Sequence, residues 1–255
     1  NGGGAWTLLT RLERQGVCLF PGKERLWIGT TEAHLLTVSR RGDSSGVVEA
    51  ELVTGFEAAE GRDSWFTPWG GPPAVRSICQ DTEGNLFVNV HVGGVLRSRD
   101  AGVSWHQTVD IGIDVHQVIP GPEAGMLLAA TGKGFAESRD GGDSWSLTDE
   151  GLDFSYMRAV TIAGEQIFAS AATGPHGDTG AVYRRSIDEK SFRKCGKGLP
   201  EWFAGNVDTF CIGSDGDSLL ALGVPGGVLY VSEDSGESWV RAEYQLPQIN
   251  GVLIP

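Results

Sequence analysis

The chain has 255 residues, a formal net charge of −13 and 38 glycines. An acidic chain is repelled by nucleic acid and by anionic lipid, so neither is expected as a partner. No apolar run reaches the ~18 residues of a membrane-spanning helix, which excludes that class of membrane protein, and the length fits one domain over residues 1–255.

Taken from the N-terminus, the chain reads as a series of short apolar segments separated by Gly, Asp and Pro, a pattern typical of antiparallel strands. Ala5–Leu12 resembles a lone last strand, and a four-strand unit begins near Val17. The clearest unit follows, with these predicted strands: Val75–Cys79, Asn85–His91, Gly94–Ser98 and Trp105–Val109. Further units begin near Val115, Met157 and Val207, and Gln248–Ile254 resembles a first strand with nothing after it.

One octapeptide of pattern S-x-D-x-G-x-S-W ends three of these units, at Ser98–Trp105, Ser138–Trp145 and Ser232–Trp239. Such a repeat with a period near 40 residues indicates propeller blades. The Asp can accept backbone N–H groups in a tight turn, the Gly can supply a left-handed backbone angle, and the Trp opens the next strand. We expect a structural role for the repeated positions, which are Ser98, Asp100, Gly102, Trp105, Ser138, Asp140, Gly142, Trp145, Ser232, Asp234, Gly236 and Trp239.

The octapeptide resembles the Asp-box, or BNR repeat, of sialidases, sortilin-type receptors, some xyloglucan hydrolases and a photosystem assembly propeller. The resemblance covers most of the chain as blades, although only the boxes match closely, and it extends to bacterial members of the same superfamily. It implies an all-β propeller of four-stranded antiparallel blades. We predict six blades, the last one closed by pairing of the two termini, with five blades as the alternative.

Aligning the first strands of the units brings one polar position into register beside apolar neighbours. It is occupied by Arg76, His116, Arg158, Asp208 and Asn250. In a propeller this position lies at the rim of the central channel, on the face we call the top, opposite the octapeptides. Two interpretations stand side by side: a ligand site, or a self-paired polar plug in which Arg158 and Asp208 neutralise each other.

Three histidines fall on the same predicted face, namely His91, His116 and His176. Imidazole is a common metal ligand and carries protons near neutral pH. These three side chains are therefore candidates for a divalent-metal site, although no cofactor is required by the sequence. Aromatic residues in loops of this face, Trp69 and Trp202, are further ligand-binding candidates because they can stack on a sugar ring or a peptide.

The sialidase resemblance implies an arginine triad, a Tyr–Glu pair and an acidic acid/base residue. Arg76 and Arg158 supply two arginines, Tyr156 stands near Arg158, and Asp208 is the candidate acid. No Arg-Ile-Pro motif occurs, so the constellation is incomplete. His116 completes the catalytic candidates, and for a two-carboxylate glycosidase the candidates are Asp208, Glu32, Asp178 and Glu201.

The four cysteines lack metal-site spacing, and we expect buried, reduced thiols, which suits a cytoplasmic protein. The sequence thus predicts a propeller that binds a small anionic or carbohydrate-like ligand in a polar funnel on the top face. A glycoside hydrolase and a protein-binding scaffold are the alternatives, and whether the chain is an enzyme stays open.

Overall fold

The computed structural model describes residues 7–40 and 47–254, and the regular secondary structure in this part of the chain is almost entirely β-strand. Its strands, in chain order, are β1 (Gly16–Pro21), β2 (Arg25–Thr30), β3 (Leu35–Ser39), β4 (Glu51–Leu52), β5 (Ala74–Gln80), β6 (Leu86–His91), β7 (Gly94–Ser98), β8 (His106–Gln107), β9 (Val115–Pro120), β10 (Leu127–Thr131), β11 (Gly134–Ser138), β12 (Ser146–Thr148), β13 (Tyr156–Ala163), β14 (Gln166–Ala172), β15 (Gly180–Ser186), β16 (Arg193–Lys194), β17 (Ile212–Ser214), β18 (Leu220–Val224), β19 (Val228–Ser232) and β20 (Val240–Arg241). The helices are single turns, α1 (Thr54–Glu57) and two 3₁₀ turns at Arg62–Ser64 and Ile111–Ile113, and none could cross a membrane.

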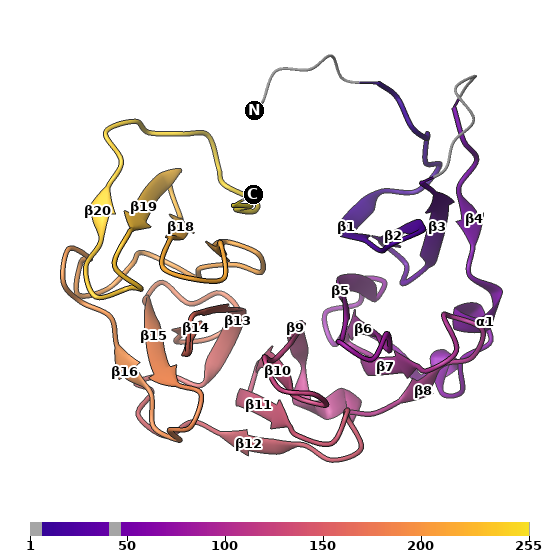
Figure 1. Cartoon of the computed structure of the whole chain (residues 1–255), viewed down its shortest axis with the longest axis horizontal. Helices are drawn as coiled ribbons and strands as arrows, with labels where there is room; N and C mark the ends of the chain where they lie inside the picture. The colour runs from indigo at the N-terminus through magenta and orange to yellow at the C-terminus, as the bar shows by residue number, and fades with distance from the viewer. Residues whose placement is uncertain (1–6, 41–46, 255) are drawn as a thin grey trace.

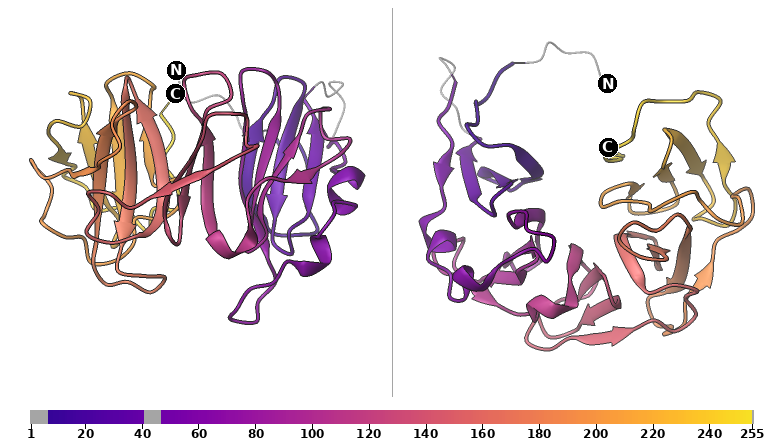
Figure 2. Two further views of the ribbon diagram at one scale, coloured as in Figure 1. Left: turned by 90° about the horizontal axis from the view of Figure 1, so that it is seen from below. Right: turned by 180° about the vertical axis from the view of Figure 1, so that it is seen from behind.

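The strands form five antiparallel sheets of four, β1–β4, β5–β8, β9–β12, β13–β16 and β17–β20. Within each sheet, strands that follow one another in the sequence are hydrogen-bonded neighbours. The first strands of successive sheets, β1, β5, β9, β13 and β17, contact one another in chain order around a central axis. Figure 1 shows the sheets as an open ring whose opening lies between the first and fifth sheets. The left view of Figure 2 shows that the strands run roughly parallel to the axis of this ring. This is the radial arrangement of a propeller.

In the second and third sheets the middle strands are buried on both sides, because each of these sheets packs between two neighbours. All five residues of β10 are buried, and so are the first five of β6. Their runs of Leu, Val and Ala are therefore continuous rather than alternating. The largest apolar cluster joins the first and second sheets through Trp27, Val75 and Trp105. Packing between sheets thus fixes the position of the first strands that line the channel.

The repeated octapeptide forms the same turn at each of its three sites. In the first, the Ser98 hydroxyl accepts the Gly102 N–H (2.8 Å), while Asp100 accepts both the N–H (2.8 Å) and the hydroxyl (2.6 Å) of Ser104. Gly102 has φ +94°, which favours glycine, and an added Cβ would lie 2.7 Å from the ring of Trp27 in the first sheet. The turn therefore closes a hairpin and touches the neighbouring sheet as well.

The prediction of six blades is not supported, because the described residues form five four-stranded sheets, as in the alternative prediction. The described part of Ala5–Leu12 and the segment Gln248–Ile254 contain no strand; Trp6 lies outside the described residues. The C-terminal segment instead lies beside the fifth sheet, where the Val252 N–H donates to the Phe210 carbonyl (2.8 Å). The paired strands of a shared blade are therefore absent from the described chain.

The fifth sheet also begins later than the sequence predicts. The segment from Val207 is not a first strand but a turn before β17, in which the Cys211 N–H donates to the Asp208 carbonyl and Phe210 has φ +63°. The prediction of unpaired cysteines is confirmed for all four, and that of burial for Cys18, Cys79 and Cys211; Cys195 is buried as well. Burial raises the pKa of the Cys18 thiol to about 12.

Candidate functional site

The polar position of the first strands is set by an irregularity in the strands themselves. The register of β5 against β6 shifts between Val75 and Ser77, which leaves Arg76 out of the pairing. The same shift occurs beside His116 in β9 and beside Arg158 in β13. An unpaired residue in a bulge is aimed differently from its neighbours. These bulges explain why a polar side chain stands among apolar ones at the top of three successive sheets.

Two of these side chains hold one carboxylate between them. Arg76 Nη2 lies 3.0 Å from one oxygen of Asp208, and Arg158 Nη1 lies 3.2 Å from the other. Both guanidinium groups are largely buried, whereas the Asp208 side chain is 48% exposed. Arg158 also donates to the Pro175 carbonyl (2.9 Å). The arrangement is an arginine clamp, meaning Arg76 and Arg158 about a shared carboxylate.

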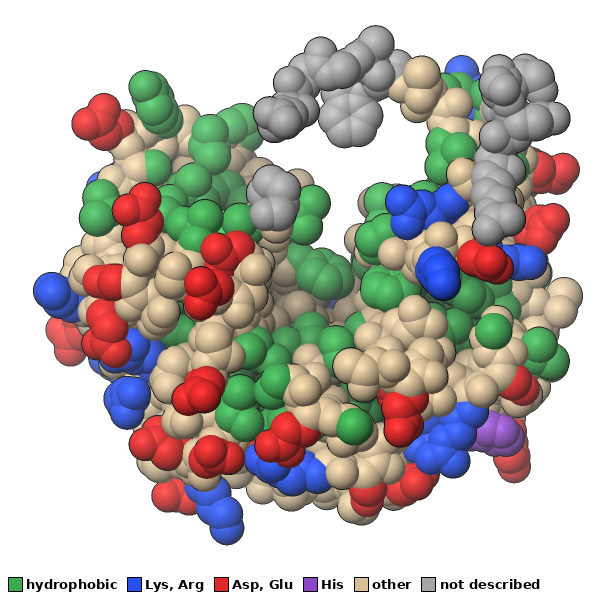
Figure 3. Space-filling model, in the orientation of Figure 1, with side chains coloured by type: hydrophobic (Ala, Val, Ile, Leu, Met, Phe, Trp, Pro, Cys, Tyr) green, Lys and Arg blue, Asp and Glu red, His purple; other side chains and the backbone are tan. Residues whose placement is uncertain are grey.

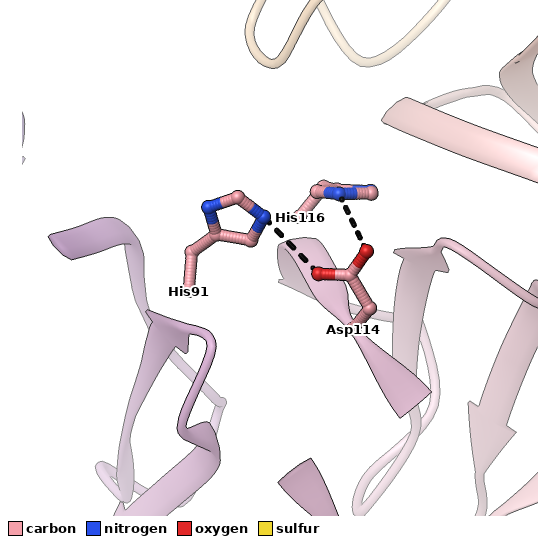
Figure 4. A group of neighbouring side chains, drawn as sticks. All are labelled: His91, Asp114 and His116. Atoms are coloured by element: carbon pink, nitrogen blue, oxygen red, sulfur yellow. Dashed lines mark ion pairs between the residues drawn. The ribbon is translucent and has the colours of Figure 1, made fainter. Parts of the chain in front are cut away.

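A second group, which we call the histidine cluster, comprises His91, Asp114 and His116. His91 Nε2 lies 3.1 Å from one oxygen of Asp114, and His116 Nε2 lies 3.4 Å from the other. Figure 4 shows the carboxylate reaching toward both imidazole rings. The Tyr156 hydroxyl lies 3.0 Å from His116 Nε2, and the Arg158 guanidinium lies 5.5 Å from the centre of the tyrosine ring. Tyr156 therefore connects the cluster to the clamp.

Burial and charge set the ionisation of these groups. Burial alone would raise the pKa of Asp208 and of Asp114, but for Asp208 the charges of Arg76 and Arg158 outweigh it. For Asp114 the contacts with His116 and His91 outweigh it, so both carboxyl pKa values are below the ordinary range. Burial lowers the pKa of His91, which favours the neutral ring. Both carboxylates are thus ionised at neutral pH.

This ionisation bears on glycoside hydrolysis, which needs a carboxylic acid that stays protonated near neutral pH. Every described carboxyl group whose pKa departs from its ordinary value has it lowered. Of the other candidates, Glu32 pairs with Arg14 (3.1 Å), and Asp178 and Glu201 are exposed in loops. Asp208 and Asp114, the two carboxyl groups of the rim, are therefore ionised where such an acid would have to be protonated.

The remaining predicted residues are dispersed. Asn250 shares a hollow of about 160 Å³ with Arg76 and Asp208, and an adjoining hollow of about 520 Å³ is also bordered by Asp208. Trp69 is 62% exposed, with its ring centre 5.2 Å from that of His91. His176 is exposed in a loop and does not join the histidine cluster. Trp202 instead packs against Phe154 and lies under Lys194 Nζ (3.5 Å).

Asp114, which joins the two histidines, was not among the residues predicted from the sequence. The available signal was an acidic residue two positions before His116, at the start of a predicted first strand. Asp114 has φ +57°, and the Gly132 N–H donates to its carbonyl (2.8 Å), so the loop between β10 and β11 holds its backbone. The side chain is thereby aimed at the cluster.

Acidification provides a test of the clamp. A carboxyl group whose pKa is lower in the folded state stabilises the fold above its unfolded pKa, about 3.9 for Asp, and this contribution is lost as pH falls through the folded pKa. Asp208→Asn should therefore be less stable than wild type above about pH 5, and the difference should shrink as the pH falls below about 4. Urea denaturation across this range measures the difference.

The control for this prediction is the Arg158→Gln background, in which the same Asp208→Asn change should have a smaller effect because one of the two attracting charges is gone. A difference between Asp208→Asn and wild type that does not change with pH would contradict the prediction.

No protein-family model matches the chain. A xyloglucanase from Paenibacillus sp. is 29% identical over 182 residues, which is 68% of this chain, and the chain matches 17% of that relative's length. The xyloglucanase of family GH74 from Xanthomonas campestris superposes with a TM-score of 0.57 and 17% identity over 86% of this chain and 36% of that one. YCF48 bound to D1 peptide gives 0.51 and 12% identity, covering 92% and 83%.

The fold is a β-propeller. At these identities the solved structures establish the fold of the propeller alone. The chain spans only a small part of the curated relative that it matches, so its likeness to a hydrolase concerns blades rather than a complete enzyme. Figure 3 shows acidic and basic side chains interspersed on one face of the propeller around a central hollow.

Proposed function

We propose that this propeller is a binding module for a small ligand that carries a carboxylate group, of the acidic-sugar type, with Arg76 and Arg158 as its anchors. The observation that carries the proposal is the clamp itself, because two guanidinium groups converge on one carboxylate at the channel rim. Arginine forms strong charge-assisted hydrogen bonds with carboxylates. Asp208 then occupies the place that the ligand's own carboxylate would take.

Three further features support a ligand of this size and class. The hollow of about 520 Å³ beside Asp208 falls in the range of small-molecule sites. The exposed ring of Trp69 and the half-buried ring of Tyr156 lie on the same face and suit stacking against a sugar. The sequence likeness to a xyloglucanase agrees with a carbohydrate ligand. We further propose that the repeated octapeptides are Asp-boxes and that the blades they close form the structural frame of this binding site.

The proposal concerns binding and not hydrolysis. A glycosidase needs one carboxyl group that is protonated near neutral pH, and both carboxylates of the rim have lowered pKa values. A xyloglucanase-like hydrolase is the alternative that the curated relative favours. A peptide whose carboxylate enters the clamp is the other, and the YCF48 structure with D1 peptide favours it.

The test measures binding of N-acetylneuraminic, glucuronic and galacturonic acids by isothermal titration calorimetry, with neutral xyloglucan oligosaccharides alongside. Arg158→Gln should weaken binding of an acidic sugar about 10- to 100-fold, since a charge-assisted hydrogen bond contributes about 1.5–3 kcal/mol. Asp208→Asn should strengthen it about tenfold, because the ligand no longer competes with an internal carboxylate.

The matched control is Arg193→Gln, which removes an exposed arginine of β16, and it should leave affinity unchanged. Acidic sugars that bind all four proteins equally, or none of them, would overturn the proposal. Binding of the neutral oligosaccharides alone, with release of reducing ends, would favour the hydrolase instead.

A further inference from the structure

The histidine cluster contains two buried polar atoms that face each other without a hydrogen bond. His91 Nε2 and Asp114 Oδ1 are 3.1 Å apart, yet neither has a hydrogen-bond partner of acceptable geometry among the described residues. Buried polar atoms are nearly always satisfied, and an exception calls for an explanation such as an ion. The arginine clamp does not explain the unpaired atoms, because its arginines pair with Asp208 and not with Asp114.

The second imidazole presents a lone pair to the same carboxylate. His116 is fully buried, and its Nδ1 lies 2.6 Å from the Met157 carbonyl. A carbonyl oxygen only accepts, so Nδ1 carries a proton, and Nε2 is the atom of this ring that can offer a lone pair to a metal ion. That nitrogen lies 3.4 Å from Asp114 Oδ2. The Tyr156 hydroxyl, 3.0 Å from Nε2, can donate to the nitrogen but leaves the Asp114 oxygen beside it unpaired. A cation bound by both acceptors would remove their repulsion.

We propose that His91, Asp114 and His116 bind a divalent transition-metal ion of the zinc type, a site that goes beyond the proposed ligand binding and does not depend on it. Two imidazoles and a carboxylate match the ligand preference of zinc. At zinc–ligand distances of about 2.0–2.1 Å, the ligand atoms of a tetrahedral site lie about 3.3 Å apart. Each imidazole nitrogen lies at about this separation from an oxygen of Asp114, 3.1 Å from Oδ1 for His91 and 3.4 Å from Oδ2 for His116. One ligand atom from each of the three residues lies within 4.8 Å of the other two.

The surroundings are those of a built metal site. The Nδ1–H of His116 is held by a backbone carbonyl, the outer contact that commonly fixes the tautomer and orientation of a ligating histidine. Asp114 is held by its left-handed backbone angle and by the Gly132 N–H. Three protein ligands leave one position open, and the Tyr156 hydroxyl borders it at 3.0 Å from His116 Nε2. On metal binding this hydroxyl gives up its hydrogen bond to that nitrogen.

The whole chain is treated with a chelator, and the chelator is removed. The metal-free protein is then titrated with Zn²⁺, followed by calorimetry, and with Co²⁺, followed by visible absorption. Wild type should bind one ion per chain and show the intense cobalt bands of a four-coordinate site. His91→Asn and Asp114→Asn should each weaken zinc affinity at least tenfold and remove those bands. Asn tolerates a left-handed backbone, so Asp114→Asn keeps the loop intact and remains informative if His91→Asn does not fold.

His176→Asn is the matched control, because this histidine is exposed and outside the cluster, and it should bind zinc as wild type does. Absence of binding in wild type would overturn the proposal. So would weak binding that is equal in all four proteins, the behaviour of an acidic surface with a net charge of −13. Because the readout is the metal itself, this outcome is independent of whether acidic sugars bind the clamp.

Discussion

Replacing Trp105 with alanine should lower the free energy of unfolding by about 3–5 kcal/mol, the usual effect of removing a large buried aromatic ring. The side chain is 3% exposed and packs edge-to-face on Phe56, with ring centres 5.4 Å apart. Its Nε1 donates to the Gly102 carbonyl (3.1 Å), so the ring ties the octapeptide turn to the contact between the first and second sheets. Urea denaturation followed by tryptophan fluorescence measures the loss.

Trp145 holds the same position in the second octapeptide and serves as the control. It is only partly buried, and its Nε1 has no hydrogen-bond partner among the described residues. Trp145→Ala should therefore cost clearly less than Trp105→Ala. Equal losses would show that the octapeptide tryptophan stabilises its own hairpin alone, and that the contact between sheets contributes little.

Arg185→Met should destabilise the fold by about 3 kcal/mol, because it leaves Glu137 without its buried partner. The Arg185 side chain is 3% exposed, and its guanidinium lies over the rings of Phe135 (5.0 Å) and Phe192 (5.3 Å) while pairing with Glu137. Glu137 also pairs with Arg139 Nε (2.6 Å), which places the effect at the lower end of the range for broken buried pairs. Thermal and urea unfolding measure the change.

The double variant Arg185→Met with Glu137→Met should recover most of this stability, since an apolar pair of similar volume can replace a buried ion pair. Arg139→Met is the exposed control and should change stability by less than about 1 kcal/mol. If the double variant is as unstable as Arg185→Met, the arginine stabilises the fold through its ring contacts, and the ion-pair explanation is wrong.

Local patterns accounted for much of the fold. Strand bounds in the second unit were predicted closely, since Gly94–Ser98 is β7 and Val75–Cys79 lies within β5. Each depends on alternation and turn residues within a few positions. Six blades were predicted, with five as the alternative, and five sheets are present in the described residues. Closure of a ring depends on how distant sheets pack and on what the two ends of the chain contact. Within residues 7–12 and 248–254, the described parts of the two predicted terminal strands, there is no strand.

The candidate site was predicted in part. Aligned first strands placed Arg76, His116 and Arg158 at one position, and bulges in β5, β9 and β13 hold them there. Pairing of Arg158 with Asp208 was one of the two sequence interpretations, and the two residues are indeed 3.2 Å apart. The sequence did not indicate that Arg76 joins them.

The sequence by itself determined the repeated turn, the all-β class and the row of polar side chains, because these depend on hydrogen bonds and periodicity among residues close in the chain. Only the tertiary structure decided which polar groups meet. Arg76 and Asp208 are 132 residues apart, and their contact depends on five sheets packing about one axis. The same holds for the histidine cluster. The left-handed backbone of Asp114, which was not predicted, aims its side chain into the cluster, whereas His176, which was predicted, is exposed in a loop.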